Sequence, residues 1–156
     1  MGNSVERVRH CLVGRGLAAR IVRFENPAKT AWEAAAEIGC ELDQIVKSMV
    51  FADRSASRVF LFLTPGGRQV SSSLAGRLTG TDLSRADPAL VRRQTGFSIG
   101  GVAPIAHPVP TRSFIDHVLL QFPDVWAAAG TPHHVFNINP EDLVTVFGAE
   151  PAGFSQ

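Results

Sequence analysis

A lysine inside an apolar, strand-like run is the first residue of this chain that could do chemistry. Lys47 lies in the stretch Ile45-Val46-Lys47-Ser48-Met49-Val50-Phe51. The only other lysine is Lys29, and arginine supplies the rest of the positive charge. A compact ammonium that faces a pocket can bind an anionic or carbonyl-bearing ligand. The alternative is a lysine at a strand end whose stem is buried while its charged head reaches water.

A glycine pair about fifty residues later could expose bare backbone to a ligand. Gly100 and Gly101 lie between apolar residues and are followed by Val102 and Pro104. Glycine lets the chain bend sharply and lets another group approach the main chain closely. The same pattern is also typical of a bulge or turn that redirects a strand. The residues alone leave both interpretations open.

The other reactive side chains give weaker evidence for a functional site. Cys11 and Cys40 occupy helix-like contexts without a histidine at a meaningful spacing, which predicts packing roles rather than a nucleophile, a zinc site or a disulfide. His107, His133 and His134 could bind a metal, but no acidic residue completes the set at a recognisable spacing. The chain also lacks Gly-x-Ser-x-Gly and the glycine-rich phosphate loop of nucleotide enzymes. We therefore predict no metal and no cofactor.

Length and composition limit the classes of protein to which the chain can belong. Its 156 residues, with 45% hydrophobic and 19% charged side chains, predict one globular domain over residues 1–156. No run is long enough to span a membrane and the N-terminus does not resemble a signal peptide, so we expect a soluble, cytoplasmic protein. The net charge of +1 argues against DNA or long nucleic acid as a partner, but it allows local capture of one tRNA end.

The elements that would position these residues predict an α+β fold, with a mixed, curved β-sheet and flanking helices. Residues 58–64 are apolar on both faces and predict a central strand, joined to the Lys47 strand by the turn at 53–57. Thr30 and Glu33 form a capping box for one helix. Helices are predicted at 5–13, 31–38, 74–78, 88–94 and 140–146, and strands at 20–24, 45–51, 58–64, 124–130 and 134–138.

The two glycine- and lysine-containing stretches together resemble a known family. The apolar run with Lys47-Ser48, followed by Thr-Gly-Phe-x-x-Gly-Gly-Val-x-Pro-x-x-His-Pro, is similar to the YbaK/ProX family of aminoacyl-tRNA deacylases. That family includes the editing domain of bacterial prolyl-tRNA synthetases and free-standing relatives that hydrolyse mischarged tRNA in trans. The likeness covers roughly residues 5–146. It implies the editing-domain fold, a tRNA acceptor end as ligand, removal of a small non-cognate amino acid, and a synthetase as a possible partner.

Carried over residue by residue, the resemblance assigns a site. Lys47 and Gly101 would be catalytic, and the substrate would be bound by Ser48, Gly100, Val102, Pro104, Thr131 and His133. We expect the Lys47 ammonium to be unpaired and to face a cleft whose opposite lip is Gly100-Gly101. An aspartate of the cysteinyl-specific members is replaced here by Val135, which leaves the amino acid open. The alternatives are a non-catalytic module that holds a tRNA end or a nucleotide and, less favoured, a metal-dependent hydrolase.

Overall fold

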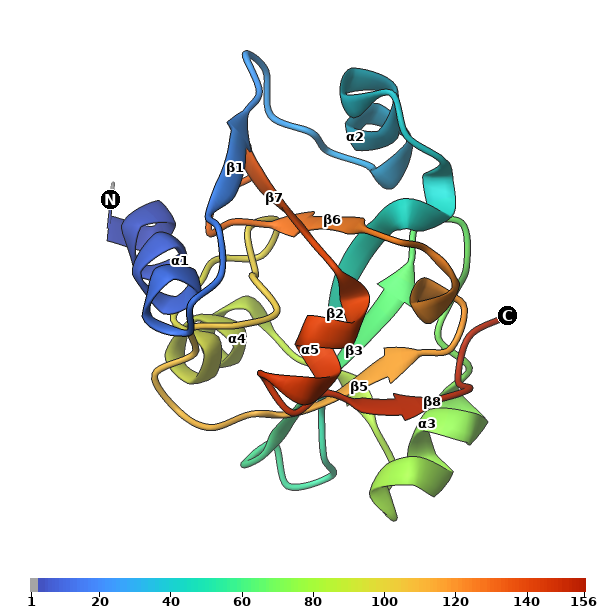
Figure 1. Cartoon of the computed structure of the whole chain (residues 1–156). Coiled ribbons are helices and arrows are strands. Elements are labelled where there is room, and N and C mark those ends of the chain that lie inside the picture. The colour runs from blue at the N-terminus through green and yellow to red at the C-terminus, as the bar shows by residue number, and fades with distance from the viewer. Residues whose placement is uncertain (1–2) are drawn as a thin grey trace.

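Two antiparallel strands run through the middle of the protein and form the centre of its sheet. In the computed structural model, which describes residues 3–156, these are β2 (Ile45–Ala52) and β3 (Val59–Pro65). All seven residues of β3 are buried, and the strand lies between β2 and β5 (Figure 1). The prediction of a central strand beside the Lys47 strand is therefore confirmed.

The remaining strands extend the sheet on both sides of this hairpin. They are β1 (Arg20–Arg23), β4 (Ser84–Arg85), β5 (Arg112–Asp116), β6 (Val125–Ala128), β7 (His134–Ile138) and β8 (Glu150–Ala152). The order is β1-β7-β6-β2-β3-β5-β8, and β4 pairs with β2 outside this path. The pairs β2/β6, β3/β5 and β5/β8 are parallel, whereas the other pairs are antiparallel. The sheet is thus mixed, as predicted, and it is open.

Helices flank the sheet, and their predicted positions are confirmed. They are α1 (Asn3–Gly14), α2 (Ala31–Ile38), α3 (Ser72–Thr79), α4 (Pro88–Thr95) and α5 (Pro140–Thr145), with short 3-10 turns η1 (Leu42–Gln44) and η2 (Leu119–Gln121). The Thr30 hydroxyl accepts the Glu33 N–H at the start of α2. In the predicted capping box the Glu33 carboxylate would accept the N–H of Thr30. It accepts instead the N–H of Lys29, one residue earlier. None of these helices is both long and apolar enough to cross a bilayer.

The two faces of the hairpin bury different clusters, which explains the two-sided apolar pattern of β3. On one face Phe62 stacks on Phe114, with ring centroids 5.1 Å apart, and meets Phe154 edge-on. On the other face Leu61 and Leu63 lie in the larger cluster, which α1, α4 and α5 also join. Because both faces are covered, this hairpin is a rigid platform for side chains at its edge.

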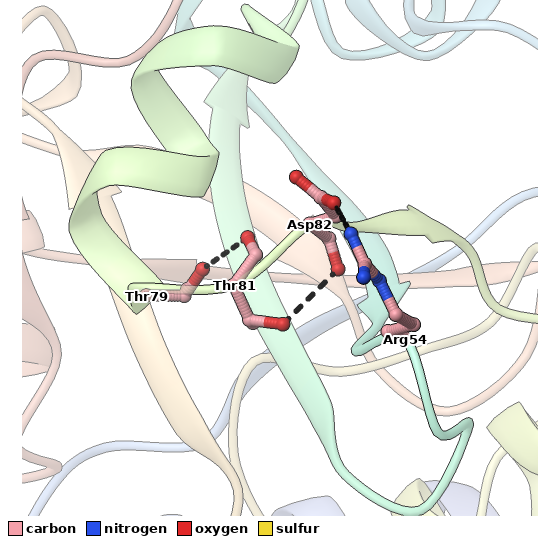
Figure 2. A network of polar contacts seen from close by, with 4 residues as sticks. All are labelled: Arg54, Thr79, Thr81 and Asp82. Carbon is pink, nitrogen blue, oxygen red and sulfur yellow. Dashed lines mark hydrogen bonds and ion pairs between the residues drawn. The ribbon is translucent and has the colours of Figure 1, made fainter.

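One edge of β2 is only partly paired. On this edge β6 pairs with Ile45 and Val46, and β4 pairs with Phe51 and Ala52. Within the described part of the chain, residues 47–50 between them have no partner strand on that side. Figure 2 shows the exposed polar network at the β4 end, where Arg54 from the β2–β3 turn pairs with Asp82, just ahead of β4.

Candidate active site

The gap along β2 opens into a cavity of about 340 Å³. Four consecutive residues of β2, Lys47, Ser48, Met49 and Val50, line it, as expected where a strand edge is open. The start of α2, the loop at Gly100 and the β6–β7 turn supply further walls; their lining residues include Lys29, Thr30, Ala31, Ile99, Gly100, Val102, Thr131, Pro132 and His134. The volume falls within the range of small-ligand sites.

The charges of the lining are all of one sign. Lys29, Lys47 and Arg85 line the cavity, whereas no aspartate or glutamate among residues 3–156 does so. The remaining lining is largely apolar, and it includes the half-buried Trp126. Cations in a partly dehydrated cavity attract an anion more strongly than they do in water. The arrangement therefore suits a ligand with a phosphate, a carboxylate or a developing oxyanion.

Ser48 presents main-chain groups to the cavity. The Val50 carbonyl accepts the Ala86 N–H on the open edge at 3.1 Å. Alternate residues of a strand turn their N–H and C=O to the same edge, so the main chain of Ser48 also faces the gap. Its buried hydroxyl has no hydrogen-bond partner among residues 3–156. A buried, unpaired hydroxyl costs free energy. The hydroxyl and the main-chain groups of Ser48 are therefore both suited to bind a polar ligand atom.

The Lys47 ammonium is anchored, so the expectation that it is unpaired is wrong. Its Nζ donates to the carbonyl oxygen of Arg68 at 2.5 Å. Burial lowers the pKa of Lys47, Asp43 opposes this shift, and Arg85 adds to it. An ammonium has three donors, and the bond to Arg68 uses one of them. Two donors are left for a ligand in the cavity.

The two glycines have different roles: Gly100 lines the cavity, and Gly101 allows two loops to pack together. Gly100 lines the cavity with a φ of +94°, and Val102 lines it too. Gly101 is not among the lining residues, and its N–H already donates to the Ser98 carbonyl at 3.0 Å. A Cβ on Gly101 would lie 2.7 Å from the Cα of Thr131, so here the absence of a side chain lets two loops touch. The predicted opposite lip is therefore Gly100 without Gly101, and the buried Pro104 also lies outside the lining.

The β6–β7 turn contributes a histidine, but not the predicted one. Thr131 lines the cavity as predicted, whereas His133 does not; its N–H donates to the Thr131 hydroxyl, and its ring lies 3.4 Å from the Phe24 carbonyl oxygen. His134 lines the cavity instead, with Nδ1 2.7 Å from the Thr131 hydroxyl. β7 begins at His134, and neighbouring residues of a strand point to opposite faces, so one position decides which imidazole faces inward.

The environment of His134 favours the neutral form of its ring. Burial lowers its pKa most, and the nearby charges of Arg23, His133 and Arg9 lower it further. The ring makes no hydrogen bond at Nε2 among the residues described. In the neutral tautomer whose Nδ1–H donates to the Thr131 hydroxyl, Nε2 is unprotonated and can accept a hydrogen bond from water or from a ligand hydroxyl.

The remaining histidine of interest is structural. His107 is packed below the glycine loop, with Nε2 2.6 Å from the Ala103 carbonyl oxygen and Nδ1 3.1 Å from the Thr111 hydroxyl. Burial lowers its pKa, the bond to Ala103 opposes this shift, and Arg7 adds to it. Residues 3–156 contain no group of three or more potential metal-ligating His, Cys, Asp or Glu side chains.

The sequence interpretation missed the contributions of α2 and β4. Lys29, Thr30 and Ala31 close one side of the cavity, and Arg85 lies on another wall. In the sequence these residues are a helix start and a loop-like arginine. Only the pairing of β4 with β2 and the packing of α2 next to β2 bring them to Lys47.

Comparisons with known proteins find a matching family model and similar solved structures. Residues 25–146 match the aminoacyl-tRNA editing domain. The crystal structure of a candidate trans-editing enzyme for prolyl-tRNA synthetase superposes with a TM-score of 0.92 at 39% identity, covering 100% of this chain and 99% of that one. The structure of the hypothetical protein APE2540 gives a TM-score of 0.89 at 29% identity over 96% of this chain and 99% of that one. The uncharacterised protein YwhH of Bacillus subtilis strain 168 is 28% identical over 79% of this chain and 78% of its own length.

Proposed function

This chain belongs to the aminoacyl-tRNA editing domain family, and from this premise we propose that it hydrolyses mischarged aminoacyl-tRNA in trans and releases a small non-cognate amino acid. The observation that carries the proposal is the cavity on the open edge of β2. It combines cationic side chains with free main-chain groups at Ser48, and no carboxylate of the described residues lines it. These features suit a nucleotide ester whose carbonyl oxygen becomes negatively charged during the reaction.

The proposed reaction is the addition of water to the ester carbonyl. The water oxygen bonds to the carbonyl carbon, the bond to the ribose oxygen breaks, and that oxygen takes up the proton that the water loses. Lys47 would stabilise the oxyanion with the N–H groups that its bond to Arg68 leaves free. The neutral His134 ring would accept a hydrogen bond from the attacking water and orient it.

A small amino acid is favoured by what surrounds the reacting groups. Met49, Val50 and Val102 on the inner walls are joined by the alanines of α2 at positions 31 and 34. The cavity of about 340 Å³ must hold the amino-acid side chain together with part of the terminal nucleoside. Such a pocket excludes larger side chains by overlap, whereas it rejects smaller ones only weakly.

The test is hydrolysis of a panel of mischarged tRNAs by the purified chain. Release of a small amino acid from a non-cognate tRNA, with correctly charged tRNA left intact and with the same rate in the presence of a chelator, is the expected result. Tight binding of the acceptor end without release would favour the non-catalytic module. Loss of the activity in chelator would favour a metal-dependent hydrolase.

A further inference from the structure

The most exposed large apolar side chain of the described residues is a tryptophan next to the cavity. Trp32 is 72% exposed. It follows Ala31, which lines the cavity, in the first turn of α2. Tryptophan is usually well buried, because its ring contributes a large apolar surface to packing. An exposed ring on the residue next to the cavity-lining Ala31 therefore calls for an explanation.

Trp32 does little for the fold. α2 packs through Ala34 and Ala35, which are buried, and its start is capped by Thr30 and Glu33. Trp32 belongs to none of the apolar clusters of residues 3–156. Within the part of the chain that the structure describes, its ring neither stacks on another aromatic ring nor makes a cation–π contact.

The surroundings of the ring leave it accessible and favour an anionic partner. Ala36, one turn further along α2, is exposed and too small to cover the indole. Glu33 and Glu37 project roughly 100° and 140° around the helix from Trp32, so they lie on another side of it. Lys29, which lines the cavity, supplies a positive charge three residues before Trp32. Ile99, which is 58% exposed, also lines the cavity.

From these observations we propose that Trp32 is a stacking platform for an unpaired base of the tRNA acceptor end, the one that precedes the terminal nucleoside in the cavity. The inference rests on the proposed function, because it requires a terminal nucleoside bound at Lys47. Single-stranded nucleic acid is commonly held by aromatic faces beside positive charges, and this needs no reading of base edges. Trp32 then contributes to binding outside the reaction centre, without touching the ester.

The kinetic test compares two substrates that differ only in the unpaired nucleotides. One is the amino-acid ester of adenosine alone, and the other is the same ester on the single-stranded trinucleotide of the acceptor end. Trp32→Ala should raise KM for the trinucleotide about fivefold or more, the factor that corresponds to the weaker measured base-aromatic stacks. It should leave KM for the adenosine ester and kcat for both substrates unchanged.

Two further variants separate stacking from a general loss of apolar surface. Trp32→Phe should restore most of the affinity, because a phenyl face still stacks. Val13→Ala removes another exposed apolar side chain, 60% exposed on α1, and should change neither KM. An equal rise in KM for both substrates in Trp32→Ala, or none for the trinucleotide, would overturn the proposal.

A binding measurement keeps the inference distinct from the proposed activity. The chain has two tryptophans, so Trp126→Phe leaves Trp32 as the only indole. Because Trp126 lines the cavity, hydrolysis is measured on this same variant. The trinucleotide without an attached amino acid should quench the fluorescence of Trp32, and adenosine should not. If hydrolysis fails but quenching occurs, the stacking surface stands and the proposed activity falls. If hydrolysis occurs without quenching, the activity stands and the stacking inference is refuted.

Discussion

Replacing Gly101 by alanine should destabilise the protein by a purely steric mechanism. An added Cβ would lie 2.7 Å from Thr131 Cα and 2.8 Å from both the Gly130 carbonyl oxygen and the Thr131 N. All three atoms are backbone, so no side chain can rotate away, and the loops at Gly100 and Thr131 must separate. Overpacking of this kind costs about 1–3 kcal/mol. A cost of about 2 kcal/mol lowers Tm by roughly 4–8 °C in a chain of this size.

The assay is urea unfolding of Gly101→Ala beside Gly14→Ala. Gly14 ends α1 with open space around it, so alanine there should leave the free energy of unfolding unchanged or slightly higher. Both displaced loops also line the cavity, so single-turnover deacylation by Gly101→Ala should slow even at temperatures where it is fully folded. If the two variants have free energies of unfolding within about 0.5 kcal/mol of each other, the steric argument fails.

Three further predictions concern stability. The pKa of His107 is lowered in the folded protein, so the unfolded chain binds more protons below pH about 6.5. Its contribution to the free energy of unfolding is therefore complete above that pH and is lost as the pH falls through it. Between two such pH values, the free energy of unfolding in urea should change less in His107→Gln than in the wild type. Asp116→Asn should lower the free energy of unfolding by about 2 kcal/mol, because the buried carboxylate accepts backbone N–H groups that the amide cannot all satisfy; an unchanged denaturation midpoint would count against this. Ser48→Ala should keep or raise stability, since its hydroxyl has no hydrogen bond to lose, and a loss above about 1 kcal/mol would reveal a hidden partner.

Much of the fold could be predicted because local signals and burial agree. β3 is apolar on both faces and is central, and the cap of α2 at Thr30 lies where the sequence places it. β4, β5 and β8 escaped prediction. β4 and β8 are very short, and an Arg112–Glu150 ion pair puts charged residues in β5 and β8. Their pairing joins segments far apart in the chain, which no local pattern reveals.

The site could be predicted only in part, because its geometry depends on long-range pairing. The positions of Lys47 and Gly100 on the cavity agree with the sequence interpretation. The anchor of the ammonium at Arg68 could not be foreseen, because it depends on how the turn after β3 folds back. The choice of His134 over His133 depends on the register of β7 against β6, which a one-residue shift would reverse.

The most direct test of the account is single-turnover hydrolysis of a mischarged tRNA by the wild type, Lys47→Ala and Lys47→Arg. A single oxyanion stabiliser is worth about 3 kcal/mol, so Lys47→Ala should slow the reaction roughly a hundredfold. It should cost only about 1 kcal/mol of stability, for the bond to the Arg68 carbonyl. Lys47→Arg should not restore the rate, because the planar guanidinium is bulkier and places its charge differently. Equal rates in the three folded proteins would contradict the account and remove Lys47 from the mechanism.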